Sequence, residues 1–493
     1  MESKEGIKVF LKKSKRYINK IRVSEKMKES KHNSFIKIGL VYTISNFVIK
    51  GMAFLTTPIF TRLMSQEEYG QFSNIASWAN IMMIITTLCL YSSISRAKYD
   101  YNSNIMGYIS TITILGSIVT LLIWAIIEWR IDFFEEMFQM NRVYIRCIML
   151  NCLFTPAVQS LITKYRMYNE YKLVIFMTWI TLLITTISSL VLTYFMKNKL
   201  TGRVVGNYAI IAVVDIIFWL YIVVKGKTFS IDMCRYACFL AIPLLIHELS
   251  GVLLNSSDRI IINQLCGSTD AALYSIAYTI AMIITVLLSS LNNAWIPWFF
   301  DKLEEDRYDE IKKYATGYTF LFTIGCIALM MIGPELVMIF GGKNYIDAIY
   351  VIPPVCLAIE FQFVYTLYVN IEFFLKKTLY ISIATAGATI INIVLNYWLI
   401  PKFGYGVAAY TTIIGYLFML VFHYIICSKT QYKKVFDERK LFLGIAITAI
   451  GMFVTLILYQ NQIIRWLSIL VIVIVILTIL YLKRKMISEI LKK

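Results

Sequence analysis

The sequence predicts an all-α, polytopic membrane protein with about fourteen transmembrane helices. Hydrophobic residues make up 58% of the 493-residue chain and charged residues 16%, against about 45–50% and about 25% in soluble domains. Apolar stretches long enough to cross a hydrocarbon core of about 30 Å follow one another from residue 35 onward, with short loops between them. The net charge of +18 is better explained by charge asymmetry across a membrane than by a nucleic-acid partner, so we expect no nucleic acid.

The expected spans are listed here in chain order. They lie near residues 36–60, 73–95, 105–127, 143–163, 173–196, 204–224, 236–257, 272–293, 314–333, 349–373, 379–400, 405–427, 441–459 and 464–482.

The first 34 residues form a basic leader. They hold eleven Lys/Arg and four Glu, with apolar residues at helical spacing between the lysines. This pattern suits either an amphipathic helix on anionic lipid or a disordered basic tail. The apolar run that follows is too long for the core of a cleavable signal peptide, so we expect no cleavage.

The distribution of Lys and Arg predicts the orientation. With a cytoplasmic N-terminus, inside segments carry 35 Lys/Arg and outside loops carry 10. The loop at 197–203 breaks this rule locally, with Lys197, Lys199 and Arg203. Positive charges favour the cytoplasmic side, so we expect both termini in the cytoplasm.

The first span contains a cation near its middle. Lys50 follows Asn46 by one turn and precedes Pro58. A mid-membrane cation costs about 2.5–3.5 kcal/mol on insertion scales and usually faces a polar interior. We therefore expect Lys50 to face a central cavity; the alternative is a structural ion pair.

The first span and the following stretch have a partial copy 202 residues later. Phe72-Ser73 aligns with Tyr274-Ser275, and Leu63 aligns with Leu265. Transporters built from two halves leave this kind of trace.

Several motifs resemble the Wzx-type polysaccharide flippases. They are N-F-V-I-K-G-M-A-F-L-T-T-P-I-F-T-R-L-M-S-Q-E-E-Y-G-Q-F-S (46–73), G-R-V-V-G (202–206), N-S-S-D-R-I-I-I-N-Q-L (255–265), A-L-Y-S-I-A-Y (272–278) and F-G-Y-G-V-A-A-Y (403–410). These flippases share a superfamily with multidrug/toxic-compound exporters and lipid II flippases. The resemblance covers residues 35 to 427.

The resemblance implies an architecture and a cargo. Two six-helix lobes, at 35–230 and 231–428, would surround a cavity that opens alternately inward and outward. Residues 429–493 would add two helices and a basic tail; in lipid II flippases such a pair forms a groove for the lipid tail. The cargo would be a polyprenyl-diphosphate-linked oligosaccharide crossing the bacterial cytoplasmic membrane, with membrane lipids and a polymerase or glycosyltransferase of the same pathway as partners. No cofactor or metal is implied.

Three cations are candidates for the diphosphate of such a cargo: Lys50, Arg259 and Arg146. Arg146 lies one turn inside its span and can reach the headgroups, so for it we favour a structural role.

Buried acids form the second group of candidates, as ion-coupling sites or as counter-ions for lumen cations. They are Asp215, Glu248, Glu360 and Asp258, with His247 beside Glu248. Glu372 and His423 fall near cytoplasmic helix ends, where we expect solvated roles.

Sugar contacts call for amides and aromatic rings. The candidates are Asn46, Asn292, Asn293, Trp295, Asn392 and Asn396.

Two other readings stay open: a multidrug antiporter of the same superfamily, and a membrane polysaccharide polymerase or glycosyltransferase. The longest outside loop, at 128–142, has no catalytic constellation, which argues against an enzyme. Gly342-Lys343 lacks the rest of a P-loop, so direct ATP use is not expected. Cys234 and Cys238 lack further metal-ligand neighbours in the sequence.

Overall fold

The computed structural model describes residues 51–482, and in this range every regular element is a helix. The chain enters it in a helix that ends at residue 63. The elements that follow are α2 (Gln66–Thr87), η1 (Leu90–Ser93), α3 (Ile94–Asp100), η2 (Asn102–Asn104), α4 (Ile105–Trp129), α5 (Ile131–Phe138), α6 (Arg142–Met167), α7 (Tyr171–Phe195), α8 (Lys199–Val204), η3 (Val205–Ala209), α9 (Ile210–Gly226), α10 (Ile231–Cys266), α11 (Ser268–Glu304), α12 (Tyr308–Met331), α13 (Gly333–Phe340), η4 (Lys343–Val351), α14 (Ile352–Phe374), α15 (Thr378–Phe403), α16 (Val407–Ser428), α17 (Glu438–Leu458) and α18 (Gln462–Leu482).

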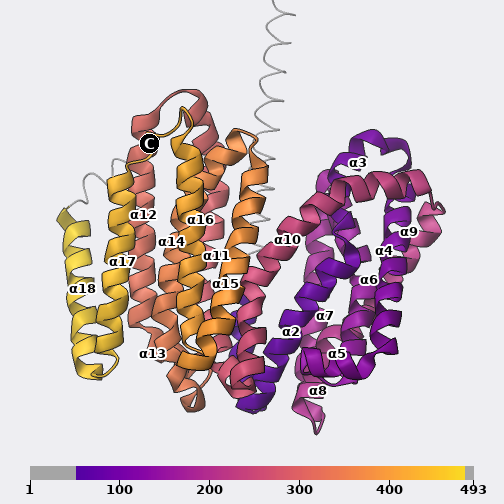
Figure 1. The fold of residues 1–493 in the computed structure, drawn as a ribbon, viewed down its shortest axis with the longest axis horizontal. Coiled ribbons are helices and arrows are strands. Elements are labelled where there is room, and N and C mark those ends of the chain that lie inside the picture. The colour runs from indigo at the N-terminus through magenta and orange to yellow at the C-terminus, as the bar shows by residue number, and fades with distance from the viewer. Residues whose placement is uncertain (1–50, 483–493) are drawn as a thin grey trace, which may run out of the picture.

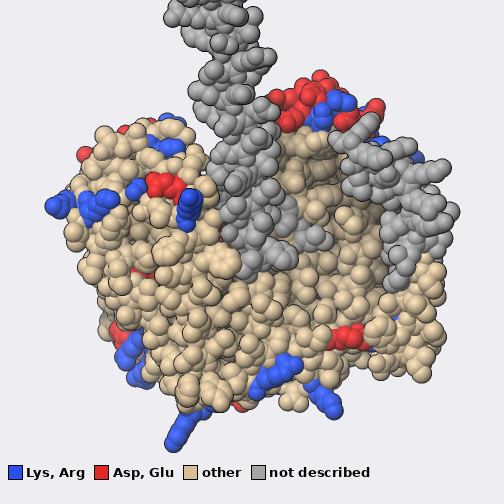
Figure 2. All heavy atoms as spheres, turned by 180° about the vertical axis from the view of Figure 1, so that it is seen from behind, with Lys and Arg blue, Asp and Glu red and all other residues tan. Residues whose placement is uncertain are grey.

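The helices have the length and composition of membrane spans. Within the described range, eleven are long and apolar enough to cross a bilayer, or twelve if the bent pair Gln66–Thr87 and Leu90–Asp100 counts as one span. The span expected near 36–60 lies partly outside this range. On the face seen in Figure 2, charged residues gather toward the two ends and a broad uncharged band separates them. The chain is therefore a multi-pass membrane protein.

The helices form two groups (Figure 1). We call α2–α9 the N-lobe and α11–α18 the C-lobe, and α10 runs obliquely between them. The first half of α10 packs into the N-lobe core through Met233, Ala237 and Ala241. Its second half packs on α15, and Leu254 lies in a cluster with residues of α14–α16. Helix α10 thus belongs to both lobes.

The length of α10 explains how it can reach both. Its 36 residues span about 54 Å at 1.5 Å per residue, more than the thickness of a bilayer core. Pro243 lies inside the helix, where the missing N–H removes one backbone hydrogen bond and favours a bend.

The two lobes touch at the end of the molecule that carries α5, α8 and α13, which we call the lower end (Figure 1). Helices α2 and α11 cross here at small residues: a Cβ on Gly70 would overlap the Ser268 carbonyl. The hydroxyl oxygens of Ser73 and Ser275 are 2.5 Å apart. Gln66 and Ser268, the first residues of α2 and α11, are also 202 residues apart, so the offset found in the sequence relates whole helices.

The second expected span, 73–95, is not one continuous helix. Helix α2 ends at Thr87 and the chain turns by 53° before continuing through η1 and α3. Leu88 and Cys89 have positive φ angles of 48° and 53°, a conformation that is rare for residues with a side chain. Thr87 Oγ1 accepts a hydrogen bond from the Cys89 N–H, which supplies a partner for one of the freed backbone groups.

Candidate functional site between the two lobes

One face of α10 carries a row of polar side chains. Glu248, Asn255 and Arg259 are separated by seven and four residues, which places them on one side of a helix. Glu248 and Asn255 are exposed and Arg259 is half-buried. We call these three residues the α10 stripe; over its twelve residues it is about 16 Å long.

The Arg259 end of the α10 stripe is held by neighbours. The Arg259 guanidinium lies 4.6 Å from the centre of the Tyr278 ring and donates a hydrogen bond of 3.0 Å to the Asn255 carbonyl. The Tyr278 hydroxyl donates to Asn255 Oδ1 at 3.1 Å. These contacts leave part of the guanidinium able to meet an anion.

The Glu248 end faces the broken helix of the N-lobe. Helix α10 packs against η1, and Glu248 lies within electrostatic reach of Cys89 and Tyr91. Interrupted helices in transporters commonly line substrate or ion sites, because their freed backbone groups and mobile ends can serve a ligand. The stripe and the break therefore form one candidate site.

The neighbouring face of α10, about 80° around the helix from the stripe, carries a buried carboxylate. Asp258 is 1% exposed. Its Oδ1 accepts a hydrogen bond from Asn396 Nδ2 at 2.6 Å, and its Oδ2 accepts from the hydroxyls of Tyr274 at 2.6 Å and Thr412 at 3.1 Å. Three donors to one carboxylate compensate much of the cost of burying its charge.

A second layer of polar groups extends this cluster. Asn396 Oδ1 accepts from the Thr411 hydroxyl at 2.5 Å. Asn392 Oδ1 accepts from Asn396 at 3.2 Å and from the Ser257 hydroxyl at 3.4 Å. We call Asp258, Asn392, Asn396, Thr411 and Thr412 the Asp258 network. It concentrates carboxylate, amide and hydroxyl oxygens in a dry site, the ligands that hard cations prefer.

The structure thus brings together three of the predicted residues: Asp258, Asn392 and Asn396. Both Asn392 and Asn396 are fully buried; Asn396 donates to Asp258 directly, and Asn392 joins the network through Asn396. Thr411, Thr412 and Tyr274 were not predicted from the sequence, although the spacing of Asn392 and Asn396 by one turn indicates a shared helix face.

The other predicted acids lie apart. Asp215 is fully buried in the N-lobe and accepts a hydrogen bond of 2.7 Å from Thr155. Glu360 is fully buried in the C-lobe and accepts one of 2.9 Å from Thr323. Within the described range, one carboxylate oxygen of each has no hydrogen-bond partner.

The remaining sugar-contact candidates are scattered. Asn292 accepts a hydrogen bond of 3.1 Å from Asn370, and Asn293 is exposed. Trp295 is buried in an aromatic stack with Phe299 and Tyr318. Half-buried His247 precedes the α10 stripe, and its Nδ1 has no partner in residues 51–482.

Two candidate cations have different outcomes. Arg146 pairs with Glu128 through hydrogen bonds of 2.8 and 2.9 Å, in line with the structural role favoured for it. Lys50, like Asn46, lies outside the described residues.

Arg203 has a role that the sequence did not predict. Counted as an outside-loop charge, it is instead 8% exposed and lies within 5 Å of the ring centres of Phe60, Tyr69 and Phe72, at 4.0, 4.9 and 3.7 Å. This cage joins α8 to α2 and the preceding helix, and it explains part of the local exception to the charge rule.

The expectation of solvated roles for Glu372 and His423 is wrong. Both side chains are fully buried, and His423 Nδ1 lies 2.8 Å from Glu372 Oε1. The two residues are 51 positions apart, and nothing in a single sequence links them.

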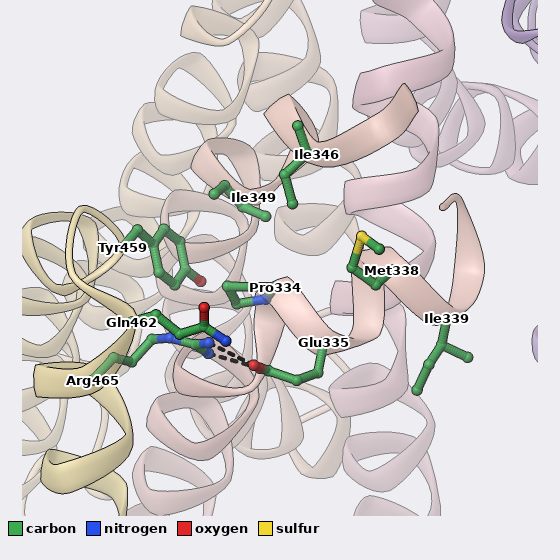
Figure 3. Close-up of a pocket in the computed structure, with 9 residues that line it drawn as sticks. All are labelled: Pro334, Glu335, Met338, Ile339, Ile346, Ile349, Tyr459, Gln462 and Arg465. Carbon is green, nitrogen blue, oxygen red and sulfur yellow. Dashed lines mark hydrogen bonds and ion pairs between the residues drawn. The ribbon is translucent and has the colours of Figure 1, made fainter. Parts of the chain in front are cut away.

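A cavity of about 600 Å³ lies beside the C-terminal helix pair (Figure 3). Its wall is apolar where α13 and η4 contribute Met338, Ile339 and Ile346. Arg465 of α18 and Glu335 of α13 point toward each other across its other side, with a shortest distance of 2.5 Å. Partial burial raises the pKa of Glu335. The hydrogen bonds and the charge of Arg465, together with a backbone hydrogen bond, outweigh this effect and hold that pKa below its usual range.

Known proteins share this architecture. The inward-closed structure of the lipid II flippase MurJ superposes with a TM-score of 0.64 at 14% identity, covering 89% of this chain and 100% of that one. An inward-facing MATE-family multidrug resistance transporter gives 0.59 at 12% identity, covering 85% and 99%. These likenesses establish the fold.

Sequence comparison establishes the family. Two Haemophilus influenzae proteins are each 22% identical: Lsg locus putative protein 1, covering 72% of this chain and 89% of the relative, and an uncharacterized membrane protein, covering 73% and 88%. Residues 35–302, more than half of the chain, match the family model described as polysaccharide biosynthesis protein. The chain therefore belongs to this family of polysaccharide biosynthesis proteins.

Proposed function

We propose that the protein is a flippase that moves a polyprenyl-diphosphate-linked oligosaccharide from the cytoplasmic to the outer leaflet by alternating access. The diphosphate is anionic and the sugars are hydrated, so unaided crossing would bring charge and many hydroxyls into hydrocarbon. A flippase must offer these groups a polar, cationic surface while the lipid tail stays in the bilayer.

The α10 stripe is the observation that carries this proposal. It is a polar surface on a helix that contacts both lobes, with a partly accessible guanidinium at Arg259 and a carboxylate at Glu248. Arg259 would contact the diphosphate, together with Lys50 of the first span. Asn255 and Asn293, both exposed, would contact the sugars.

The Asp258 network is our candidate for coupling transport to an ion gradient. Asp258 is adjacent to Arg259 in the chain, so a cation or proton bound at its carboxylate would reduce the field that Asp258 exerts on the guanidinium. Asp215, Glu248 and Glu360 are the other candidates for this role.

We place the lower end outside and the opposite end in the cytoplasm. The count of 35 inside against 10 outside Lys/Arg supports this orientation. Two of the ten outside residues, Arg203 and Arg465, are buried, so the difference in exposed positive charge between the two sides is larger still. Reporter fusions after Lys434 and Lys493 should both give cytoplasmic signals. An external signal from either fusion would contradict the orientation.

The cavity of Figure 3 is our candidate for the lipid tail. Its apolar wall at Met338, Ile339 and Ile346 suits hydrocarbon, and it borders the helix pair α17–α18.

Growth complementation tests the flippase proposal. In a strain that lacks its own flippase, we expect Arg259→Ala and Lys50→Ala to abolish complementation, while Arg259→Lys and Lys50→Arg retain part of it because the charge survives. Arg146→Ala is the matched control, since that arginine is paired with Glu128; it should complement fully. Protein levels in the membrane are measured alongside.

Full complementation by both alanine variants at normal levels would contradict the assigned cargo contacts. Failure of the wild-type protein to complement, with export of cationic drugs instead, would favour the multidrug antiporter.

A further inference from the structure

Glu372 of α14 and His423 of α16 form a buried pair that the proposed transport site does not use. His423 Nδ1 and Glu372 Oε1 are 2.8 Å apart, so one hydrogen lies between them. Both residues are fully excluded from solvent. The pair is also distinct from the Asp258 network, which occupies other residues of α10, α15 and α16.

The surroundings of the pair are mainly aromatic. The His423 ring stacks on Tyr365, with 5.7 Å between ring centres, and meets Phe422 edge-on. After α14, the Lys377 N–H donates to the Glu372 main-chain carbonyl at 2.8 Å. The other titratable or charged groups that the packed elements present here are Tyr368 of α14, Tyr416, Tyr424 and Cys427 of α16, Glu438 of α17 and the Lys377 ammonium.

Two of these neighbours are hydrogen-bonded elsewhere, while the buried Tyr368 hydroxyl has no hydrogen-bond partner in residues 51–482. The Tyr424 hydroxyl donates to Glu438 at 3.2 Å, and the Cys427 thiol donates to the Tyr368 carbonyl at 3.5 Å. Helix α11 contributes the neutral amide of Asn292, which is bonded to Asn370. In the described part of the chain, Glu372 Oε2 and His423 Nε2 have no hydrogen-bond partner.

Burial therefore decides the charge of the pair. A carboxylate beside a neutral imidazole carries a net negative charge, which is costly in a fully buried site. One added proton gives a neutral pair, either as imidazolium with carboxylate or as imidazole with carboxylic acid. The proton belongs to the pair rather than to either residue.

We propose that Glu372 and His423 form a proton-binding site that holds one proton between α14 and α16. Loss of this proton leaves an uncompensated charge at the contact of the two helices and so weakens it. His423 follows Thr412 by eleven residues on α16, about three turns, so both lie on one face of this helix. Proton release at the pair would thereby act on α16, the helix whose Thr412 hydroxyl donates a hydrogen bond to Asp258.

The protonation of His423 Nε2 distinguishes this proposal from a plain hydrogen bond. Nε2 carries a hydrogen in the imidazolium–carboxylate pair and in the neutral pair whose carboxylic acid donates to Nδ1. In the net negative form, Nδ1–H donates to the carboxylate and Nε2 is bare. The chain has only three histidines, His32, His247 and His423, so nitrogen NMR of the full-length, ¹⁵N-histidine-labelled protein can assign each ring by single Gln substitutions.

We expect a protonated Nε2 for His423 in the wild-type protein at neutral pH, and a change of that signal in Glu372→Gln. A bare Nε2 in the wild type would overturn the proposal. This measurement needs no cargo, so its outcome is independent of the flippase assignment.

Thermal unfolding across pH gives a second, independent readout. Unfolded Glu and His side chains have pKa values near about 4.3 and about 6.5, so under the proposal a folded pair that keeps its proton above about 6.5 would bind one proton more than the unfolded chain. The Tm advantage of wild type over Glu372→Gln/His423→Gln should then shrink as pH rises above about 6.5. An advantage that is constant above about 6.5 and shrinks below it would overturn the proposal.

Discussion

Two buried sites, one against each lobe, hold their charged groups in different ways. Against the C-lobe, Asp258 of α10 receives three hydrogen bonds from residues of α11, α15 and α16. In the N-lobe, Asp215 receives one, from Thr155. The guanidinium of Arg203 is surrounded by aromatic rings and pairs with no carboxylate of residues 51–482. A change in the charge of a carboxylate that is hydrogen-bonded to three helices affects all three contacts. A change in the charge of a carboxylate with a single partner affects one contact.

Under the proposed function, this difference would let the Asp258 network respond to an ion while the Arg203 site stays fixed. Around Asp258, hydroxyl and amide groups could reorient on binding of a cation or proton, because each can change its hydrogen-bond partner. Around Arg203 the contacts are ring faces and the Met64 sulfur, which offer fewer alternative hydrogen bonds. Substitutions that compare the two lobes should show this contrast, and four follow in order of expected effect.

Asp258→Leu should have the largest effect on stability. It leaves Tyr274, Asn396 and Thr412 without their common acceptor, and we expect a loss of about 2–4 kcal/mol. The measurement is thermal or denaturant unfolding in detergent. A loss no larger than that of Asp215→Leu would remove the contrast between the lobes.

Arg203→Lys should be the next largest, at about 1–2 kcal/mol. A lysine ammonium keeps the charge, but it is strongly hydrated and cannot stack on several rings as a planar guanidinium does. Arg203→Met is the informative comparison, because an apolar side chain of similar length avoids burying a charge; it should unfold nearer to wild type than Arg203→Lys. The reverse order would show that the cage selects for charge alone.

Asp215→Leu should cost about 1 kcal/mol, because only Thr155 loses its acceptor. The same unfolding assay measures it, with Thr155→Val as the matched variant on the other side of the bond. If Asp215→Leu also abolishes gradient-dependent transport, the coupling site lies in the N-lobe, and the Asp258 network is not the site that responds to an ion.

Arg146→Gln should leave the unfolding midpoint and transport unchanged. Its partner Glu128 is accessible, and exposed ion pairs contribute little to stability. Loss of complementation by this variant at a normal protein level would return Arg146 to the list of cargo contacts.

The fold class could be predicted from the sequence because apolar length and composition are local properties. The bounds of α4, α6 and α7 lie close to the expected spans 105–127, 143–163 and 173–196. The break at Leu88 and Cys89 could not be predicted, because both are ordinary apolar residues and the left-handed backbone there is imposed by packing.

The site was harder to predict for a related reason. Asp258 was identified as a candidate, but two of its three partners, Asn396 and Thr412, lie 138 and 154 residues away. The sequence predicts that Asn396 lies in a membrane span. Whether its side chain meets Asp258 depends on how α15 is rotated about its axis relative to α10, which the sequence does not show. Glu372 and His423 illustrate the same limit, since each alone looks like a residue near a helix end.

The Ser73–Ser275 contact has a consequence for the history of the chain. In a dimer of identical subunits, a residue beside the twofold axis meets its own copy. Ser73 and Ser275 are equivalent under the 202-residue offset and their hydroxyls touch, as expected if a half-length ancestor dimerised through this helix before its gene was duplicated and fused. Fusion then released each copy to change alone, and the neighbouring pair already differs: Gly70 in α2 meets Ala272 in α11.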